Sequence, residues 1–443
     1  MQRTPTSGRP EDDPSTRFDE ARARYDARRA ARAEDPSVDD ERPSVYRFDR
    51  STIVHRTPAH PVRDGVEVMS PAFHADPMDH YRWMQEHAPV YWDDITGLWA
   101  LTRHRDISHV EANHEVYCSV KGSRPESSVP SMINLDPPEH TRRRRIVSSG
   151  FTPRRVAAHE EFLRQTVRGL MDRVDDQGHC DFVTDIATSI PLQMIAKLMG
   201  LPAADEEKLL HWSDLFATGG EAIRSQVETA VLEWVGYIVD QMEARTDPEA
   251  EDLISLLMYT DGEPLSAEDL IYETMLILVG GDETTRHVMS GGLEALLLHP
   301  EQLAMLRADR SLLPDAIEEM LRWVTPVRNM SRTATTDVEL GGQQILAGDR
   351  VLLLYLAGNR DPEVFDDPAR FDITRADARN HLAFGANGRH FCLGAQLARL
   401  ELRVLFEEVL DRWPNIAPAE PGGPRPERTG NFVLGIEQLP VTF

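Results

Sequence analysis

Residues 384–394 read F-G-A-N-G-R-H-F-C-L-G, and apolar residues at helical spacing follow at once. Because Cys392 falls on a glycine-rich turn before this helix, the helix amides and dipole are expected to stabilise its thiolate. A thiolate there suits metal binding, although a lone cysteine is more often a small buried hydrophobe. Gly385 and Gly388 favour the interpretation of Cys392 as a metal ligand over that of a buried hydrophobe, because glycine lets the backbone pass close to a flat group.

This stretch resembles the haem-binding loop of the cytochromes P450, the haem-thiolate monooxygenases. The resemblance implies that Cys392 is the axial ligand of haem b, iron protoporphyrin IX, and that Phe384, His390 and Gly394 contact this cofactor. In the family the phenylalanine lies seven residues before the cysteine, whereas Phe384 lies eight residues before Cys392. The loop must therefore absorb one extra residue, at position 386 or 387. A similar longer loop occurs in some actinobacterial sterol-oxidising members.

A second stretch, residues 136–145, reads D-P-P-E-H-T-R-R-R-R. His140 and Arg144 are four residues apart and so share one face of a predicted helix. On its own, a run of arginines indicates a solvated helix face. The family resemblance instead gives His140 and Arg144, together with Arg332, the role of binding the haem propionates.

Glu319 and Arg322 lie one helical turn apart, a spacing that usually makes a weak surface ion pair. The resemblance implies more for this pair. With Arg370 in P-A-R-F, Glu319 and Arg322 are expected to form a structural trio that locks the loop carrying the cysteine.

A long helix is predicted from Ser266 to Leu298, with a capping box at its start and Pro300 after its end. Two adjacent glycines in its middle, Gly280 and Gly281, cost about 1 kcal/mol each relative to alanine. A kinked core helix would explain them. The segment also resembles the family's oxygen-activation helix, which implies that Gly281 contacts the haem. Thr284 and Glu283 are then the catalytic alcohol and the acid that delivers protons to it.

The chain of 443 residues has a net charge of −26, which argues against nucleic-acid binding. Three cysteines and the lack of a long apolar run predict a cytoplasmic protein with no disulfide framework and no membrane span. Residues 1–60 are charged and are expected to be disordered. The resemblance implies that residues 61–443 form a single cytochrome P450 domain, mainly α with small β-sheets (α+β), with a long helix over the haem. We expect a monomer.

Other elements follow from periodicity and turn residues. Helices are predicted over 159–175, 186–199, 204–216 and 223–245. β-Hairpins are predicted over 90–102 and 431–443, on either side of turn-forming residues.

The resemblance implies a monooxygenase that uses O2 and electrons passed from NAD(P)H through a ferredoxin reductase and a ferredoxin. The arginines at 142, 143 and 145, with Arg399 and Arg403, are expected to form the surface that receives the ferredoxin. Two other classes of function remain open, a peroxygenase driven by hydrogen peroxide and a non-catalytic haem-binding protein. The pair of Glu283 and Thr284 favours the monooxygenase, because neither alternative needs it.

The substrate is expected to be lipophilic. Similarity to actinobacterial cytochromes favours a sterol or steroid hydroxylated at the end of its side chain, with a terpenoid, fatty acid or macrolide as alternatives. The side chains expected to line the substrate cavity are those of Ile277, Gly280, Val327, Met330, Phe432 and Val433.

Overall fold

The computed structural model describes residues 58–125, 129–218, 224–260, 264–420 and 427–443, together with Ala23, Ala27 and Arg56. The extension predicted over residues 1–60 therefore lies almost entirely outside the described residues. Within the described ranges, no helix combines the length and the apolar character that a membrane span needs.

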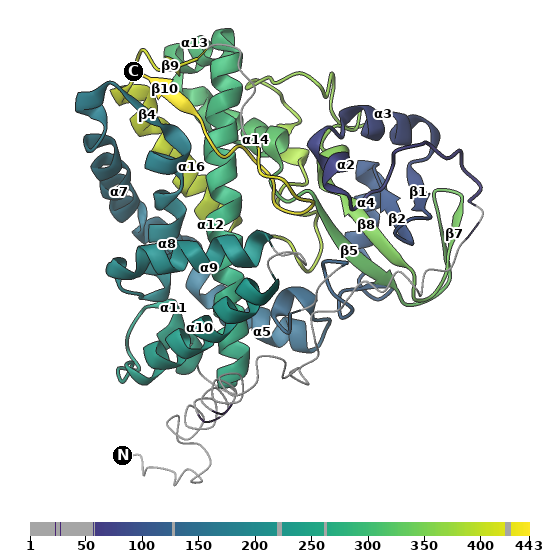
Figure 1. Cartoon of the computed structure of the whole chain (residues 1–443), viewed down its shortest axis with the longest axis horizontal. Coiled ribbons are helices and arrows are strands. Elements are labelled where there is room, and N and C mark those ends of the chain that lie inside the picture. Colours follow the sequence, from purple (N-terminus) through teal and green to yellow (C-terminus); the bar gives the residue numbers. More distant parts are fainter. Residues whose placement is uncertain are drawn as a thin grey trace, which may run out of the picture.

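Helices make up the larger part of the molecule (Figure 1). They are α2 (Pro71–Ala75), α3 (Met78–His87), α4 (His104–Ala112), α5 (Glu139–Val147), α6 (Pro153–Ala158), α7 (Glu160–Asp172), α8 (Ser189–Met199), α9 (Glu206–Thr218), α10 (Arg224–Glu243), α11 (Leu253–Met258), α12 (Ala267–Leu298), α13 (Pro300–Ala308), α14 (Leu313–Val324), α15 (Tyr355–Gly358) and α16 (Ala395–Arg412). The four helices predicted between residues 159 and 245 are α7 to α10, and their ends differ from the prediction by three residues or fewer.

The long helix α12 organises the helical part. The Ser266 hydroxyl accepts a hydrogen bond from the Asp269 N–H at 3.1 Å, and the helix ends at Leu298, before Pro300. Its predicted limits are therefore confirmed. α12 packs against α8, α9, α14 and α16, and Figure 1 shows it between α7, α8 and α16 on one side and the main sheet on the other.

The strands are short: β1 (Val90–Asp93), β2 (Leu98–Leu101), β3 (Tyr117–Cys118), β4 (His179–Asp181), β5 (Asn329–Ala334), β6 (Val338–Leu340), β7 (Gln343–Ile345), β8 (Arg350–Leu354), β9 (Ala417–Pro418) and β10 (Pro440–Thr442). The main sheet has the order β1-β2-β8-β5-β3, with β2 and β8 parallel. The hairpin predicted over 90–102 is β1 and β2.

The prediction of a C-terminal hairpin over residues 431–443 is wrong. The last strand, β10, pairs with β4 and β9, which come from distant parts of the chain, with Val441 opposite Cys180. Alternation of apolar residues shows that a segment is a strand, but it does not identify the partner strand.

Apolar side chains form one large core among the helices and one smaller cluster on each face of the main sheet. Strand β8 separates the two smaller clusters, because Val351 and Leu353 point to one face and Leu352 and Leu354 to the other. Met330 and Arg332 of β5 and the middle of α12 line a cavity between the helical part and the sheet.

Candidate active site

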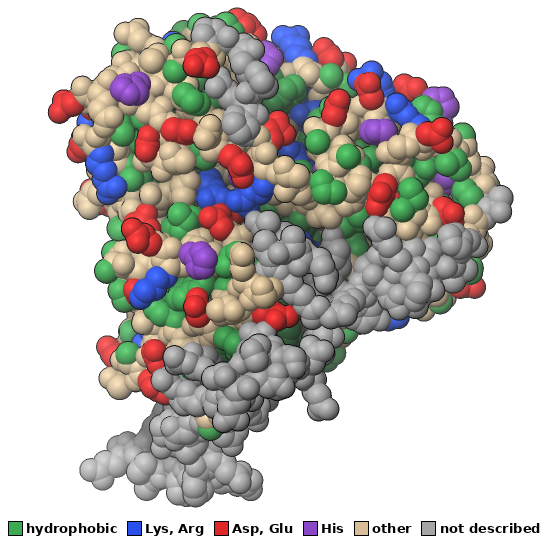
Figure 2. Space-filling model, in the orientation of Figure 1, with side chains coloured by type: hydrophobic (Ala, Val, Ile, Leu, Met, Phe, Trp, Pro, Cys, Tyr) green, Lys and Arg blue, Asp and Glu red, His purple; other side chains and the backbone are tan. Residues whose placement is uncertain are grey.

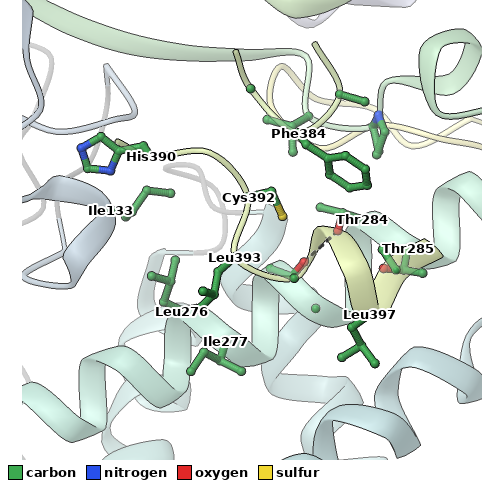
Figure 3. Close-up of a pocket in the computed structure, with 18 of the residues that line it drawn as sticks. Ile133, Leu276, Ile277, Thr284, Thr285, Phe384, His390, Cys392, Leu393 and Leu397 are labelled. Atoms are coloured by element: carbon green, nitrogen blue, oxygen red, sulfur yellow. Dashed lines mark hydrogen bonds between the residues drawn. The ribbon is translucent and has the colours of Figure 1, made fainter. Parts of the chain in front are cut away.

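The loop before α16 brings Cys392 to the wall of this cavity (Figure 3). The Cys392 N–H donates to the Phe384 carbonyl at 2.9 Å, so the loop closes on itself. Burial raises the pKa of the Cys392 thiol, while a hydrogen bond from the Gly394 amide and the charges of Arg144 and Arg399 lower it. The helix start therefore offsets part of the cost of a buried thiolate, as the sequence predicted.

Cys392 as the available ligand fits a haem iron and not a metal ion held by side chains alone. Among the described residues, no group of three His, Cys, Asp or Glu side chains is placed to hold a metal. An iron bound to Cys392 needs its remaining ligands from a macrocycle. Gly394 leaves the room for one, because a Cβ added there would meet nothing within 4 Å. Phe384 also lines the cavity.

Four basic side chains predicted to contact the haem, His140, Arg144, Arg332 and His390, all line the cavity. The rings of His140 and His390 lie 4.3 Å apart between centroids. Burial lowers the pKa of His140 to about 4 and that of His390 to about 2, so both rings are neutral at pH 7. Both ring nitrogens of His140 are buried with no hydrogen-bond partner, which fits a site built for the carboxylates of a ligand.

The two central glycines of α12 have different surroundings. A Cβ on Gly280 would meet nothing within 4 Å, and Gly280 lines the cavity. A Cβ on Gly281 would lie 2.3 Å from Cδ1 of Ile195 in α8. Gly281 also lines the cavity, and the packing of α8 requires that it has no side chain, a reason that the sequence did not indicate.

Thr284 lines the cavity, and its hydroxyl donates to the Gly280 carbonyl at 2.7 Å (Figure 3). This hydroxyl can exchange that acceptor for a group in the cavity without moving the helix backbone. The position agrees with the role predicted for Thr284.

Glu283, predicted to be the acid that feeds protons to Thr284, faces away from the cavity. Glu283 is fully buried but does not line the cavity, and its carboxylate pairs with Arg286 and Arg428, each at 2.5 Å. Burial acts to raise the pKa of Glu283, but the nearby His287 ring, 3.6 Å away, and the charges of the two arginines hold it well below its usual range. Adjacent residues of a helix point about 100° apart, so the neighbour of a cavity residue commonly faces another element.

Glu401 of α16 is a buried acid at the cavity that the sequence did not single out. It lines the cavity, is almost fully buried, and its Oε2 has no hydrogen-bond partner. Burial, and then the charge of nearby Asp282, raise the pKa of Glu401 well above its usual range. The sequence did contain a signal, because Glu401 lies four residues from both Leu397 and Leu405 on the apolar face of the predicted helix.

The cluster predicted around Glu319 and Arg322 is present with one different member, and Arg322 also donates to the carbonyls of Asn359 and Pro368. Arg322 donates to both oxygens of Glu319, at 2.6 and 2.7 Å, with both side chains fully buried. Arg370 contributes only its carbonyl, at 3.0 Å from Arg322, while its guanidinium is 59% exposed beside Asp372. The predicted side-chain role of Arg370 is therefore wrong, and Arg375 takes it, 3.3 Å from Glu319. The turn after residue 370 points the first arginine to solvent and the second inward.

Of the residues predicted to line the substrate cavity, Ile277, Gly280, Val327 and Met330 do so. Phe432 and Val433 do not line it. Val433 lies behind Val327 in an isolated antiparallel bridge, and the ring of Phe432 lies 4.2 Å from the guanidinium carbon of Arg124. The apolar wall is completed by Met132, Ile133, Leu276 and Val288.

The arginine surface predicted for a redox partner is largely neutralised. Arg143 is buried and pairs with Glu139, Asp269 and Glu273. Arg142 also pairs with Glu139, at 2.8 Å. The same holds on α16, where Arg399 pairs with Glu318 and Arg403 with Glu160 and Glu407. Arg145 remains exposed.

Residues 223–443 match the family model described as Cytochrome P450. Two curated relatives, each named Steroid C26-monooxygenase, are similar over most of their length. The one from Mycolicibacterium smegmatis is 40% identical, covering 86% of this chain and 96% of the relative, and the one from Mycobacterium tuberculosis is 41% identical, covering 82% and 92%.

Two solved structures have the same architecture. CYP268A2 of Mycobacterium marinum in complex with pseudoionone has a TM-score of 0.78 at 34% identity, covering 87% of this chain and all of that one. CYP109E1 of Bacillus megaterium in complex with testosterone has a TM-score of 0.78 at 29% identity, covering 84% and 99%. With the mainly helical fold and Cys392 at the cavity wall, these matches show that the chain belongs to the cytochrome P450 family.

Proposed function

We propose that this protein is a haem-thiolate monooxygenase that hydroxylates the terminal side-chain carbon of a sterol or steroid. The observation that carries the proposal is one apolar cavity that receives both the Cys392 sulfur and the Thr284 hydroxyl. Haem b bound at Cys392 supplies the activation of O2 that attack on an unactivated C–H bond requires. The protein's own groups position the substrate and supply protons.

In this proposal His140, Arg144, Arg332 and His390 hold the propionates, and Thr284 donates a proton from its hydroxyl into the cavity. Glu401 offers a further proton-binding group at the cavity wall, and burial raises the pKa of its carboxyl. Glu283, the acid predicted to supply that proton, is paired with Arg286 and Arg428 next to the cavity wall. A hydroxyl at position 284 favours the monooxygenase over a peroxygenase or a non-catalytic haem protein, since neither needs a proton donor there.

The steroid assignment is supported by the names of the curated relatives and by the apolar wall formed by Met132, Ile277 and Val327. Such a wall suits a rigid apolar body whose narrow alkyl end reaches the iron. The single electrons are proposed to come from NAD(P)H through a ferredoxin reductase and a ferredoxin. A cytoplasmic monomer is the proposed working form.

The experiment has two parts. The reduced protein with carbon monoxide is expected to show the red-shifted band of a thiolate-ligated haem, and Cys392→Ser is expected to abolish it. Cys118→Ser and Cys180→Ser are the matched controls and should keep it. Titration with cholest-4-en-3-one should shift the haem to high spin, and turnover with ferredoxin should give the terminal alcohol. A spin shift with a macrolide, a monoterpene or a fatty acid, and none with sterols, would reject the substrate but not the monooxygenase.

A further inference from the structure

Glu111, in the last turn of α4, is a buried acid that has no part in the chemistry proposed above. Its side chain is 3% exposed, and it lines the cavity. The carboxylate accepts hydrogen bonds from three groups in three other parts of the chain. These are the Arg332 guanidinium at 3.4 Å, the Ala386 N–H at 2.5 Å and the Tyr355 hydroxyl, which makes a short contact.

The haem-binding loop lies directly on Glu111. A Cβ added to Gly388 would be 2.5 Å from the Glu111 carbonyl oxygen, and one added to Gly385 would be 3.0 Å from its carboxylate. Gly385 also has a φ of +77°, which disfavours any side chain. The two glycines that predicted close approach to a cofactor therefore make room for α4. Between them, Ala386 is buried in the cluster on one face of the sheet.

The contact between Glu111 and Ala386 lies at the extra residue of the haem-binding loop. Residues 386 and 387 are where the loop is one residue longer than the family pattern, and an extra residue brings an extra backbone N–H that must be satisfied. The Ala386 N–H donates to Glu111, so α4 supplies the missing acceptor. The added length is thus held by a side chain from outside the loop.

The other oxygen of the same carboxylate, Oε1, accepts the hydrogen bond from Arg332. The Arg332 guanidinium lies against Glu111 and also donates to the Ser331 carbonyl at 2.9 Å. Burial, followed by the charge of Glu111, raises the pKa of Tyr355 well above its usual value, so the phenol remains a donor that orients the carboxylate. The side chain predicted to hold a propionate therefore takes its orientation from Glu111.

We infer that Glu111 is a positioning residue of the haem site, which sets both the longer haem-binding loop and Arg332 relative to the cavity. This inference rests on the proposed function, because Arg332 and the loop matter only if haem is bound there. It predicts that loss of the carboxylate weakens haem retention and thiolate ligation more than it weakens the fold.

Glu111→Gln is the informative variant, because glutamine has the same shape but only one acceptor oxygen. Whichever way the amide is oriented, its NH2 group faces either Arg332 or the Ala386 N–H. Asp93→Asn is the matched control. Asp93 is 1% exposed and also accepts three hydrogen bonds, from the N–H groups of Val68 and Ile95 and from the Thr96 hydroxyl, but it does not line the cavity.

The measurements are the rate of haem transfer to excess apomyoglobin, the fraction of carbon monoxide complex with the thiolate band, and the urea midpoint of each holoprotein. Glu111→Gln is expected to lose haem about tenfold faster, because one buried hydrogen bond to a charged group is worth about 1.5 kcal/mol or more. It should also lose part of the thiolate band. Asp93→Asn is expected to lower the urea midpoint while leaving both haem measurements unchanged.

A wild-type rate of haem loss in Glu111→Gln would overturn the inference, as would an equal rate in Asp93→Asn. If Glu111→Gln does not fold, Tyr355→Phe removes one donor and is expected to give a smaller change in the same direction. A wild-type rate in Tyr355→Phe would then overturn it. Lack of the thiolate band in the wild-type holoprotein would instead refute the proposed function and the inference together.

Discussion

The two adjacent glycines of α12 are expected to respond in opposite ways to replacement by alanine. Both substitutions should gain about 1 kcal/mol from helix propensity. At Gly280 no protein atom lies within 4 Å of the new Cβ, so Gly280→Ala should be more stable by up to about 1 kcal/mol. The new methyl group enters the cavity, however, and is expected to weaken binding of bulky ligands.

At Gly281 the new Cβ would lie 2.3 Å from Cδ1 and 2.6 Å from Cγ1 of Ile195, and Ile195 is buried between α8 and α12. Overpacking of this kind costs about 1–3 kcal/mol. After the gain in propensity, Gly281→Ala should be less stable than wild type by about 1 kcal/mol. The two variants should then differ by about 2 kcal/mol, although the same methyl group is added to neighbouring residues of one helix.

The assay is urea unfolding of each variant, followed by circular dichroism, with Ile195→Val measured in both backgrounds. In the wild-type background Ile195→Val should cost about 1 kcal/mol. In the Gly281→Ala background it should cost less, because it removes the closest clashing atom, and the coupling should exceed about 0.5 kcal/mol. Equal stabilities of the two glycine variants, or no coupling to Ile195, would refute the assignment of Gly281 to helix packing.

Three further predictions concern proton delivery, the loop lock and pH. Thr284→Ala should keep consuming O2 and reductant but release peroxide, and loss of substrate binding with unchanged coupling would contradict this. Arg375→Ala should destabilise the holoprotein by about 2 kcal/mol, because the buried Glu319 keeps Arg322 but loses a second charged partner, whereas the exposed Arg370→Ala should change stability by less than about 0.5 kcal/mol. Burial acts to raise the pKa of Glu318, but the hydrogen bond from Arg399 helps to lower it to about 2. The ionised Glu318 therefore contributes unfolding free energy above about pH 4.5, and this contribution should be lost as the pH drops toward 2. Glu318→Gln should reduce that slope in acid titrations of the unfolding free energy, and an unchanged slope would contradict the assignment.

The sequence alone determined the features that depend on local order along the chain. The cap at Ser266 and Pro300 after the last turn defined α12, because both act within a few residues. The i, i+4 spacing placed His140 and Arg144 on one face of α5, and both line the cavity. The glycine-rich turn before α16 placed Cys392 at a helix start, and this indicated the haem site.

Tertiary structure decided which element each side chain meets. Glu283 pairs with Arg428, 145 residues away, and not with its neighbour Thr284, because the helix turns it from the cavity. Arg375 replaces Arg370 in the lock because the turn between them reverses which side chain points inward. No periodicity encodes either result.

The glycines show the same limit most clearly. At Gly281 and Gly388 the sequence predicted that a flat group approaches the backbone closely. What approaches is Ile195 of α8 in the first case and Glu111 of α4 in the second. The sequence records that a side chain is absent, but the neighbour that requires its absence comes from a distant segment, and only the packing of the helices brings that segment into place.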